Sequence, residues 1–361
     1  MKRRTTTTLD DVARAAGVSP ATVSRCINRP ASVREEKRER ILNTIERLGY
    51  VPNGSARALA SKKTRMIGAI MPSLDNMLFG GPLEAFQKEV GSAGYTVAVA
   101  CSEYDPQQER IHIRNFLESR VDGLLLVGAQ RDPDIYRQLE QQGVPYVLTW
   151  ISSDTRKEHC VGFDNAAAAE QLVDYLVTLG HRHFAMISGF IEHNDRAKAR
   201  YFGVRNALER HGLSLPPDQL LHRPFEPDAG RDAFHLLMSA ENPPTCILCG
   251  SEPHAYGALF EARDMNVDVP GEVSVTGFDD MWLASQISPP LTTVRTPRGR
   301  MGRQAAHHLL AQLRGERLVA PRPIETTLVV RKSTAPPRPT PLLQRVDTDH
   351  FQARTRVKSG S

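Results

Sequence analysis

Residues 8–34, TLDDVARAAGVSPATVSRCINRPASVR, decide the fold of the N-terminal part of this chain. Thr8 precedes a short helical pattern and Asp11 follows three positions later, which is the spacing of a capping box. Apolar residues recur on one helical face at Leu9, Val12, Ala13 and Ala16. Gly17 ends the pattern, because glycine tolerates the positive φ that a tight turn requires. The stretch therefore opens with a capped helix and a turn.

A second short helix is predicted directly after the turn. Ser19 suits its N-cap and Pro20 suits its first position, where the missing N–H costs nothing. Val23 and Ile27 are expected on its inner face. The outer face carries Ala21, Thr22, Ser24, Arg25 and Asn28. Because this outer face has hydrogen-bonding groups and no acid, it can enter a major groove without repelling phosphates. The pattern predicts a helix-turn-helix with the second helix as reader; the alternative is a helical hairpin with a polar solvent face.

A third helix completes the predicted head, residues 1–50. Ser32 and Glu35 have the spacing of a second capping box, and Gly49 ends the helix. Its apolar face is formed by Ile41, Ile45 and Leu48. Residues 51–65 then read as a hinge or linker that is too short and too weakly apolar to form a stable free helix. This segment is expected to fold when it binds something.

Charge is distributed unevenly along the chain, although the net charge is only +5. Residues 1–65 contain 15 lysines and arginines against 6 acids, and residues 331–361 contain 7 against 2. The part between them contains 24 against 33. A basic head on an acidic body is typical of a nucleic-acid-binding module joined to a second module that does not bind nucleic acid.

Several classes of protein are disfavoured by the sequence. No apolar run approaches a membrane span, and the basic N-terminus is not followed by the apolar segment of a signal peptide. Cys246 and Cys249 lie in an apolar run that reads as a strand, so they point to opposite faces. With no second Cys or His pair at ligand spacing, we expect no metal and no cofactor, and a cytoplasmic protein with reduced thiols.

The body, residues 66–332, alternates apolar strands with helical segments, which predicts two doubly wound parallel-sheet lobes. The first set of expected strands is 66–72, 95–101, 122–128 and 144–150, and the second is 161–163, 183–189, 245–250 and 273–280. The expected helices are 79–93, 106–119, 133–142, 164–180, 196–211, 228–240 and 252–266. The segments 291–297 and 326–330 are expected to be crossovers or edge strands. Ligands of such folds bind at the carboxyl ends of the strands, here between the lobes. Residues 333–361 are rich in proline and basic, and are expected to be a disordered tail.

These features together resemble the LacI/GalR family of bacterial transcription repressors. The head motif, YVPNGSARALASKKT, LGHRHFAMISG, NDRAKARYFGVRNAL, VSVTGFDD and PPLTTVRTP recur in that family in this order. The resemblance covers nearly all of residues 8–332. It implies an α/β protein with an all-α helix-turn-helix head and a two-lobed core like that of periplasmic binding proteins.

The resemblance also implies roles in DNA binding. The positions that match contacts to the phosphate backbone are Thr8, Ser19, Thr22, Asn28, Ser32 and Arg34. The positions that match contacts to base edges are Pro20, Ala21, Ser24 and Arg25, and Arg25 is suited to a bidentate contact with guanine. The positions that match the hinge helix in the minor groove are Asn53, Ala56, Leu59 and Ala60. Leu59 is expected to open a central base step as a wedge and bend the duplex, with core packing as the alternative.

In the body, the resemblance places an effector between the lobes. Arg200 and Asp279 match residues that bind the ligand through hydrogen bonds and charge. The matching apolar or stacking positions are Phe79, Trp150 and Phe225, for which core packing is the alternative. Asn76 matches a polar contact after the first strand.

One position departs from the family pattern. Where Asn-Asp is usual, this chain has Ser251-Glu252, followed two residues later by His254. The longer acid is expected to fill more of the cleft, and His254 to add a titratable donor. We therefore expect an effector other than the familiar neutral sugar, such as an amine or a sugar acid.

The sequence thus predicts a homodimeric repressor that binds a near-palindromic double-stranded operator and responds to a small polar metabolite such as a sugar or sugar acid. It is expected in the cytoplasm, associated with the nucleoid. The alternative is a small-molecule receptor without DNA readout. An enzyme is not predicted, because no GxGxxG follows the first strand and neither GxxxxGK[ST] nor GxSxG is present.

Overall fold

A computed structural model describes residues 7–52, 63–75, 77–152 and 156–338. The head contains α1 (Leu9–Ala16), α2 (Pro20–Asn28) and α3 (Glu35–Leu48). The predicted capping box of α1 is confirmed: the Thr8 hydroxyl accepts from the Asp11 amide at 3.2 Å, and the Asp11 carboxylate accepts from the Thr8 amide at 3.0 Å. The Ser19 cap of α2 and the left-handed Gly17, with φ 64°, are confirmed as well.

One local prediction for the head is wrong. Ser32 does not cap α3: it ends a short 3-10 helix, η1 (Pro30–Ser32), and its hydroxyl donates to the Arg29 carbonyl. On α2, Val23 is buried and Ile27 is half-buried against the core of the head, as predicted, and Cys26, which was not predicted there, is buried as well. Residues three and four positions along a helix both return near the same face, so Cys26 and Ile27 can both accompany Val23 there. The small core of the head is formed by Val12, Ala13, Ala16, Val23, Cys26, Val33 and Ile41.

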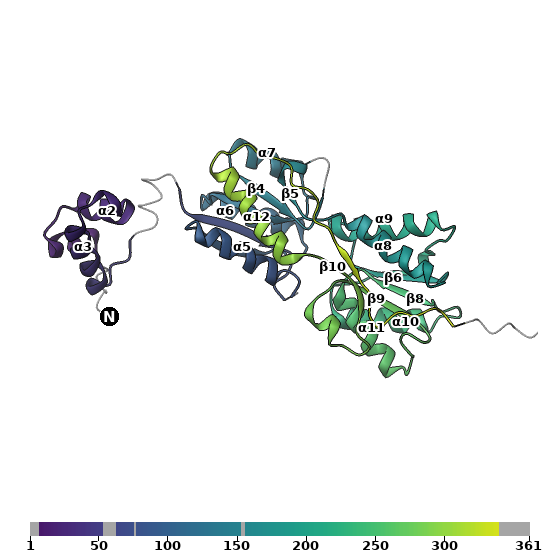
Figure 1. The fold of residues 1–361 in the computed structure, drawn as a ribbon. Coiled ribbons are helices and arrows are strands. Elements are labelled where there is room, and N and C mark those ends of the chain that lie inside the picture. The colour runs from purple at the N-terminus through teal and green to yellow at the C-terminus, as the bar shows by residue number, and fades with distance from the viewer. Residues whose placement is uncertain (1–6, 53–62, 76, 153–155, 339–361) are drawn as a thin grey trace, which may run out of the picture.

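The first lobe is built on a five-stranded parallel sheet in the order β2-β1-β3-β4-β5. Its strands are β1 (Met66–Met71), β2 (Thr96–Cys101), β3 (Gly123–Val127), β4 (Tyr146–Thr149) and β5 (Cys160–Val161). The helices α6 (Pro106–Glu118) and α7 (Pro133–Gln141) cover one face. On the other face lie α5 (Gly80–Ser92) and α12 (Arg298–Leu313), which pack on each other (Figure 1).

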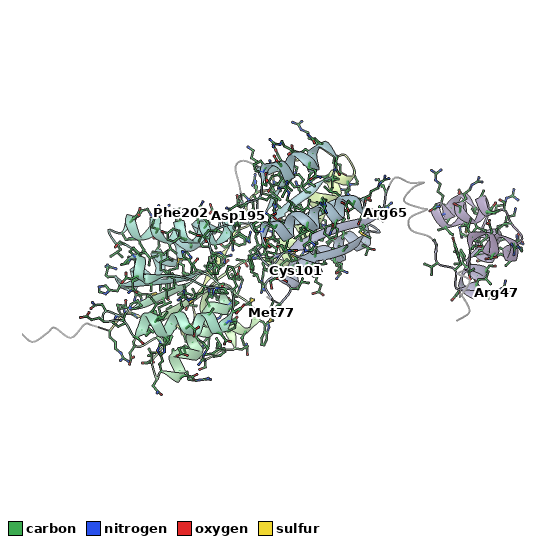
Figure 2. The ribbon with its side chains drawn as sticks, turned by 180° about the vertical axis from the view of Figure 1, so that it is seen from behind. Arg47, Arg65, Met77, Cys101, Asp195 and Phe202 are labelled. Carbon is green, nitrogen blue, oxygen red and sulfur yellow. The ribbon has the colours of Figure 1, made fainter. Side chains whose placement is uncertain are left out.

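The second lobe is built on a six-stranded sheet in the order β11-β10-β9-β8-β6-β7, parallel except for β11. Its strands are β6 (Phe184–Ser188), β7 (Leu220–His222), β8 (Cys246–Cys249), β9 (Ser274–Asp279), β10 (Thr292–Arg295) and β11 (Thr327–Val329). The helices α8 (Asn165–Thr178) and α9 (Asp195–Arg210) pack together, as do α10 (Pro227–Met238) and α11 (Glu252–Asp264). Short 3-10 helices are η3 (Pro217–Gln219) and η4 (Trp282–Ser285) in this lobe and η2 (Lys157–His159), which contacts β4, in the first lobe. Side chains fill both lobes, and Asp195 lies at their junction (Figure 2).

Some elements differ from the sequence expectation. The strand expected at 161–163 in the second set is β5, which pairs with β4 in the first sheet. β10, expected as a crossover or edge strand, lies inside the second sheet between β9 and β11. β7 and α12 were not predicted. The chain passes between the lobes after β5, after β10 and after α12, and such long-range returns leave no local pattern in sequence.

Residues 333–338, expected to begin the tail, pack against the second lobe. The Ser333 hydroxyl donates to the Val275 carbonyl at 2.6 Å, and the Ala335 carbonyl lies 2.9 Å from His181 Nε2. Thr334 shares a hydrogen bond with Thr292 at 2.9 Å. Within the described ranges, no helix is long and apolar enough to cross a membrane.

Candidate functional site

The outer surface of α2 is the first candidate site. Arg25, Ala21 and Asn28 are exposed, and α2 carries no acidic residue. The Asn28 side-chain amide donates to the Ser24 backbone carbonyl at 2.9 Å and to the Ser24 hydroxyl at 3.3 Å, which fixes these two side chains relative to each other. The other predicted head contacts that are described are exposed or half-buried: Thr8, Ser19, Pro20, Thr22, Ser32 and Arg34. The predicted hinge residues Asn53, Ala56, Leu59 and Ala60 lie outside the described residues.

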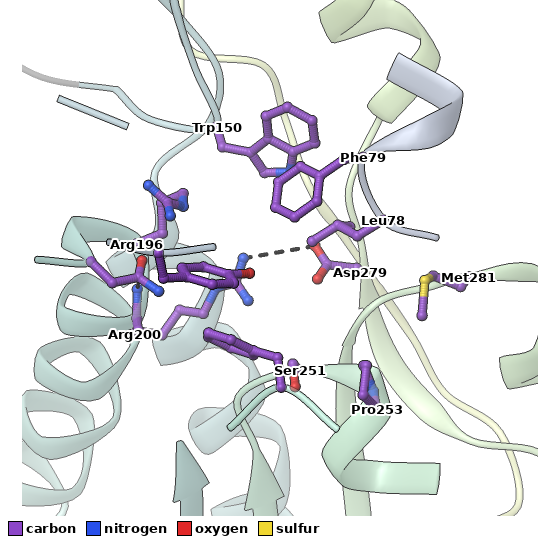
Figure 3. A pocket seen from close by; sticks show the side chains of 13 residues that line it. Leu78, Phe79, Trp150, Arg196, Arg200, Ser251, Pro253, Asp279 and Met281 are labelled. Atoms are coloured by element: carbon purple, nitrogen blue, oxygen red, sulfur yellow. Dashed lines mark hydrogen bonds and ion pairs between the residues drawn. The ribbon is translucent and has the colours of Figure 1, made fainter. Parts of the chain in front are cut away.

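The second candidate site is a narrow cavity of about 30 Å³ between the two lobes (Figure 3). From the first lobe it is lined by Leu78, Phe79, Tyr104 and Trp150. From the second lobe it is lined by Asn194, Arg196, Ala197, Arg200, Phe225, Ser251, Pro253, Asp279 and Met281. Trp150 directly follows β4, and Asp279 ends β9. The cavity thus lies at the carboxyl ends of the strands, where doubly wound folds bind ligands.

Aromatic rings form the walls of the cavity. Phe79 and Trp150 meet edge to face with ring centroids 5.0 Å apart. Tyr104 of the first lobe stacks on Phe225 of the second, also at 5.0 Å. Burial raises the pKa of Tyr104 to about 12, so its phenol is neutral at physiological pH. The predicted residues Phe79, Trp150 and Phe225 therefore face the same cavity; Asn76 lies outside the described residues.

Arg200 is held in one orientation at the floor of the cavity. Its Nε donates to Asn165 Oδ1 at 2.9 Å, and its Nη1 donates to the Gly250 carbonyl at 2.7 Å. Nη2 lies 3.7 Å from Asp279 Oδ1, and the guanidinium carbon lies 3.8 Å from the centroid of the Phe278 ring. Burial raises the pKa of Asp279, and the neighbouring Arg200 opposes that rise. The pair presents a fixed donor beside a fixed acceptor, which suits hydroxyl or carboxylate groups.

Two residues that line the cavity each have a buried polar atom without a hydrogen-bond partner in the described part of the chain. These atoms are the indole nitrogen of Trp150 and the hydroxyl of Ser251, in residues that are 2% and 3% exposed. Buried polar groups in native proteins are normally paired. Because these two come from opposite lobes, a molecule that paired both would bridge the lobes.

Glu252 does not line this cavity, contrary to the sequence expectation. Its carboxylate faces the interior of the second lobe and accepts from the Tyr256 hydroxyl at 2.6 Å, the Met281 amide at 2.7 Å and the Thr293 hydroxyl at 3.0 Å. Glu252 is the first residue of α11, and at this position the side chain lies against β9 and β10 rather than toward the opening. Burial raises its pKa to about 7.

His254 is not a titratable cavity donor either. Its Nε2 donates to the Pro224 carbonyl at 2.6 Å, and its ring stacks on Phe225 with centroids 5.5 Å apart. Burial lowers its pKa to about 4, so the ring is neutral at physiological pH. His254 thus supports the wall of the cavity from behind.

Sequence reasoning missed four polar residues of the cavity as site residues: Tyr104, Asn194, Arg196 and Ser251. Arg196 was recognisable, since it precedes Arg200 by four residues and therefore shares its helix face. Ser251 departs from the family pattern together with Glu252, and only the acid was predicted to enter the cavity. Tyr104 lies far from the other residues in sequence, and only the fold brings it to them.

The head and the two-lobed body define a class of proteins, the helix-turn-helix transcription regulators with a periplasmic-binding-protein-like domain. Residues 8–53 match the family described as bacterial regulatory proteins, lacI family, and residues 173–334 match the periplasmic binding protein-like domain. The regulator GntR of Pseudomonas aeruginosa is 35% identical over 310 residues, covering 86% of this chain and 90% of the relative. The repressor CytR of Escherichia coli is 31% identical over 334 residues, covering 92% and 98%.

Solved structures agree with this class. A crystal structure of the lac repressor dimer, bound to operator and the anti-inducer ONPF, has a TM-score of 0.81 and 26% identity, covering 91% of this chain and 99% of that chain. A complex of the regulator CelR with cellobiose has a TM-score of 0.65 and 29% identity, covering 91% and 99%. The chain belongs to the lacI family: it is a DNA-binding transcription regulator and not an enzyme.

Proposed function

We propose that this protein is a homodimeric repressor that reads a near-palindromic operator and is controlled by a small polar metabolite bound between its lobes. The observation that carries the proposal is the inter-lobe cavity, in which Trp150 and Ser251 offer unpaired hydrogen-bonding atoms from opposite lobes. A molecule bound there has a different affinity for open and closed lobes, which is what control of a two-state protein requires.

The α2 surface supports operator reading in the major groove. Arg25 is exposed on a helix without acids, so its guanidinium can make a bidentate contact with guanine. Pro20 and Ala21 have no side-chain hydrogen bonds and would discriminate by apolar contact, for example with thymine methyl groups. The hinge residues Asn53, Ala56, Leu59 and Ala60 would order in the minor groove, with Leu59 as the wedge. Such binding would place the protein in the cytoplasm at the nucleoid.

A homodimer would present two heads to two half-sites, so a two-fold protein matches a two-fold operator. The body has exposed apolar side chains that a partner would cover, such as Met77, which is 56% exposed. The lac repressor, one of the structural relatives, was solved as a dimer bound to operator.

The cavity suits a compact molecule with several hydroxyl groups. Aromatic rings from both lobes can cover the apolar faces of a sugar ring, while Arg200, Asp279 and Ser251 offer both donors and acceptors at its edge. We therefore propose a sugar, a sugar acid or a similar polar metabolite. Since Glu252 faces away from the cavity, it does not select the effector by contact.

The alternative is a small-molecule receptor without DNA readout. Selection of bound sequences from a random duplex library, with and without a metabolite pool, separates the two. Enrichment of a palindrome that changes with the pool is expected for the repressor. If no sequence is enriched under either condition, the head does not recognise a DNA sequence, and the protein is a small-molecule receptor instead.

A further inference from the structure

Asp195 joins the second lobe to the first. It is the first residue of α9, and its Oδ2 accepts from two consecutive backbone amides of the other lobe, Ala129 at 2.5 Å and Gln130 at 3.1 Å. Both amides belong to the loop that follows β3. Hydrogen bonds from successive backbone N–H groups to a carboxylate are charge-assisted, and each is roughly twice as strong as a hydrogen bond between neutral groups.

The receiving loop has the shape this contact requires. Gly128 has a φ of 73°, and a Cβ there would lie 2.1 Å from Arg196 Nη1 and 2.6 Å from Asp195 Oδ1. A side chain at position 128 would therefore collide with the second lobe. The buried Arg131 holds the loop from the inside: it donates to the Gly128 carbonyl at 2.8 Å and to the Val127 carbonyl at 3.1 Å.

Arg131 is itself fixed by an acid. Its Nη2 lies 2.8 Å from Glu109 Oε1, and its side chain is 2% exposed. With the carbonyls of the loop directed inward to Arg131, the amides of Ala129 and Gln130 are directed to Asp195. The loop is thus built in advance to receive a carboxylate.

Arg196 connects this contact to the cavity. Its Nη1 donates to Asp195 Oδ1 at 2.9 Å, and the same side chain lines the inter-lobe cavity beside Arg200 (Figure 3). Arginine has five N–H donors, so Arg196 can hold Asp195 and a bound molecule at once.

We propose that Asp195, Arg196 and the Gly128–Gln130 loop form a clasp that holds the lobes closed, and that a molecule in the cavity strengthens the clasp through Arg196. The regulatory part of this inference rests on the proposed effector control. The clasp and the effector favour the same closed state, so each increases the stability of the other. Loss of the clasp shifts the lobes toward the open state by about tenfold.

The opening can be measured without any effector. The chain has two tryptophans, Trp150 inside the cavity at 2% exposure and Trp282 at 63% exposure. In a Trp282→Phe background, fluorescence comes from Trp150 alone, and its quenching by acrylamide reports how often the cavity opens. Asp195→Ala is expected to raise the quenching constant severalfold. Asp195→Asn, which keeps one acceptor, is expected to fall between the parent and the alanine variant.

Asp228→Ala is the matched control. Asp228 is an exposed acid in the first turn of α10, so its loss removes the same favourable helix-end charge without touching the first lobe. We expect its quenching to equal that of the parent. Equal quenching in Asp195→Ala and the parent, with folding confirmed by circular dichroism, would overturn the clasp. An equal rise in both alanine variants would overturn it too, since the effect would then come from the helix end.

The coupling between the clasp and the effector is measured separately, through operator binding. With the operator and a pure sugar or sugar acid recovered by the library selection, the concentration that changes operator binding is expected to rise about tenfold in Asp195→Ala. If quenching rises but this concentration does not, the coupling to the effector is wrong although the clasp exists. If no metabolite changes operator binding in the parent, the proposed effector control fails, while the quenching result still decides the clasp.

Discussion

Arg200 and Asp279 lie 3.7 Å apart at the centre of the cavity, one from α9 and the other from the end of β9. Both side chains are almost fully buried. Two buried charges are stable only when each is paired and hydrogen-bonded, and Arg200 meets this condition with Asn165 and the Gly250 carbonyl. The pair therefore presents a preformed polar surface to a ligand.

Arg200→Ala is expected to abolish the effector response while operator binding persists. The substitution removes the donor fork and leaves Asp279 buried without its partner, which lowers the stability of the second lobe by about 3–5 kcal/mol. Arg200→Lys is expected to fail as well, because one ammonium cannot reach Asn165 and Gly250 in the fork geometry. Operator binding, followed by fluorescence anisotropy with and without the selected metabolite, tests this. Arg210→Ala, an exposed position on the same helix, is the control; an unchanged response in Arg200→Ala would refute the role.

Glu252→Gln is expected to remove a pH dependence of stability. Because the pKa of Glu252 is raised from 4.5 to about 7, the folded state binds the proton more tightly than the unfolded state. The protonated Glu252 contributes its full stabilisation below pH 4.5. As the pH rises to about 7, the free energy of unfolding falls by about 3 kcal/mol. Urea unfolding of wild type and Glu252→Gln at several pH values measures the difference. A difference that stays constant between pH 4.5 and 7 contradicts the assignment.

Arg25→Ala is expected to weaken binding to the selected operator by about 1–3 kcal/mol and to relax the preference at one base position. The physical reason is the loss of a bidentate contact with a base edge. Anisotropy titrations on the operator and on its single-base variants measure both effects. Arg47→Ala on α3 serves as the control for general loss of charge. Uniform weakening on all sequences would make Arg25 a phosphate contact instead.

Ile41→Ala is expected to destabilise the head by about 2–5 kcal/mol, because it leaves a cavity in a core of only a few side chains. The body has separate cores, so its unfolding is expected to remain unchanged. Operator binding, with differential scanning calorimetry of the same samples, follows the two parts. Leu42→Ala, at a position 47% exposed, is the control. Normal operator binding by Ile41→Ala would show that the head does not depend on this core.

Local features of the head could be read from sequence because they depend on neighbours a few residues apart. The Thr8–Asp11 capping box, the Ser19 cap and the Gly17 turn follow from hydrogen bonds and φ preferences within one helical turn. Ser32 shows the limit of such rules, since its hydroxyl donates to the Arg29 carbonyl and does not accept from an amide of α3.

The candidate site could be read in part. Arg200, Asp279, Phe79, Trp150 and Phe225 were placed by resemblance, and all five line one cavity. Arg196 follows from its spacing to Arg200 on α9, whereas Tyr104 could not be assigned to the cavity from spacing, because its place depends on how the two lobes meet.

The sequence by itself determined the local and periodic parts of this protein: the helix-turn-helix, most strands and helices of the body, and the chemistry available at the strand ends. Only the tertiary structure decided that α12 returns to the first lobe, that Glu252 faces inward to Tyr256 and Thr293, and that Asp195 reaches the amides of Ala129 and Gln130. Periodicity records which face of an element is apolar. The partner of a buried polar side chain is set by packing between elements that lie far apart in the chain, and no local pattern encodes it.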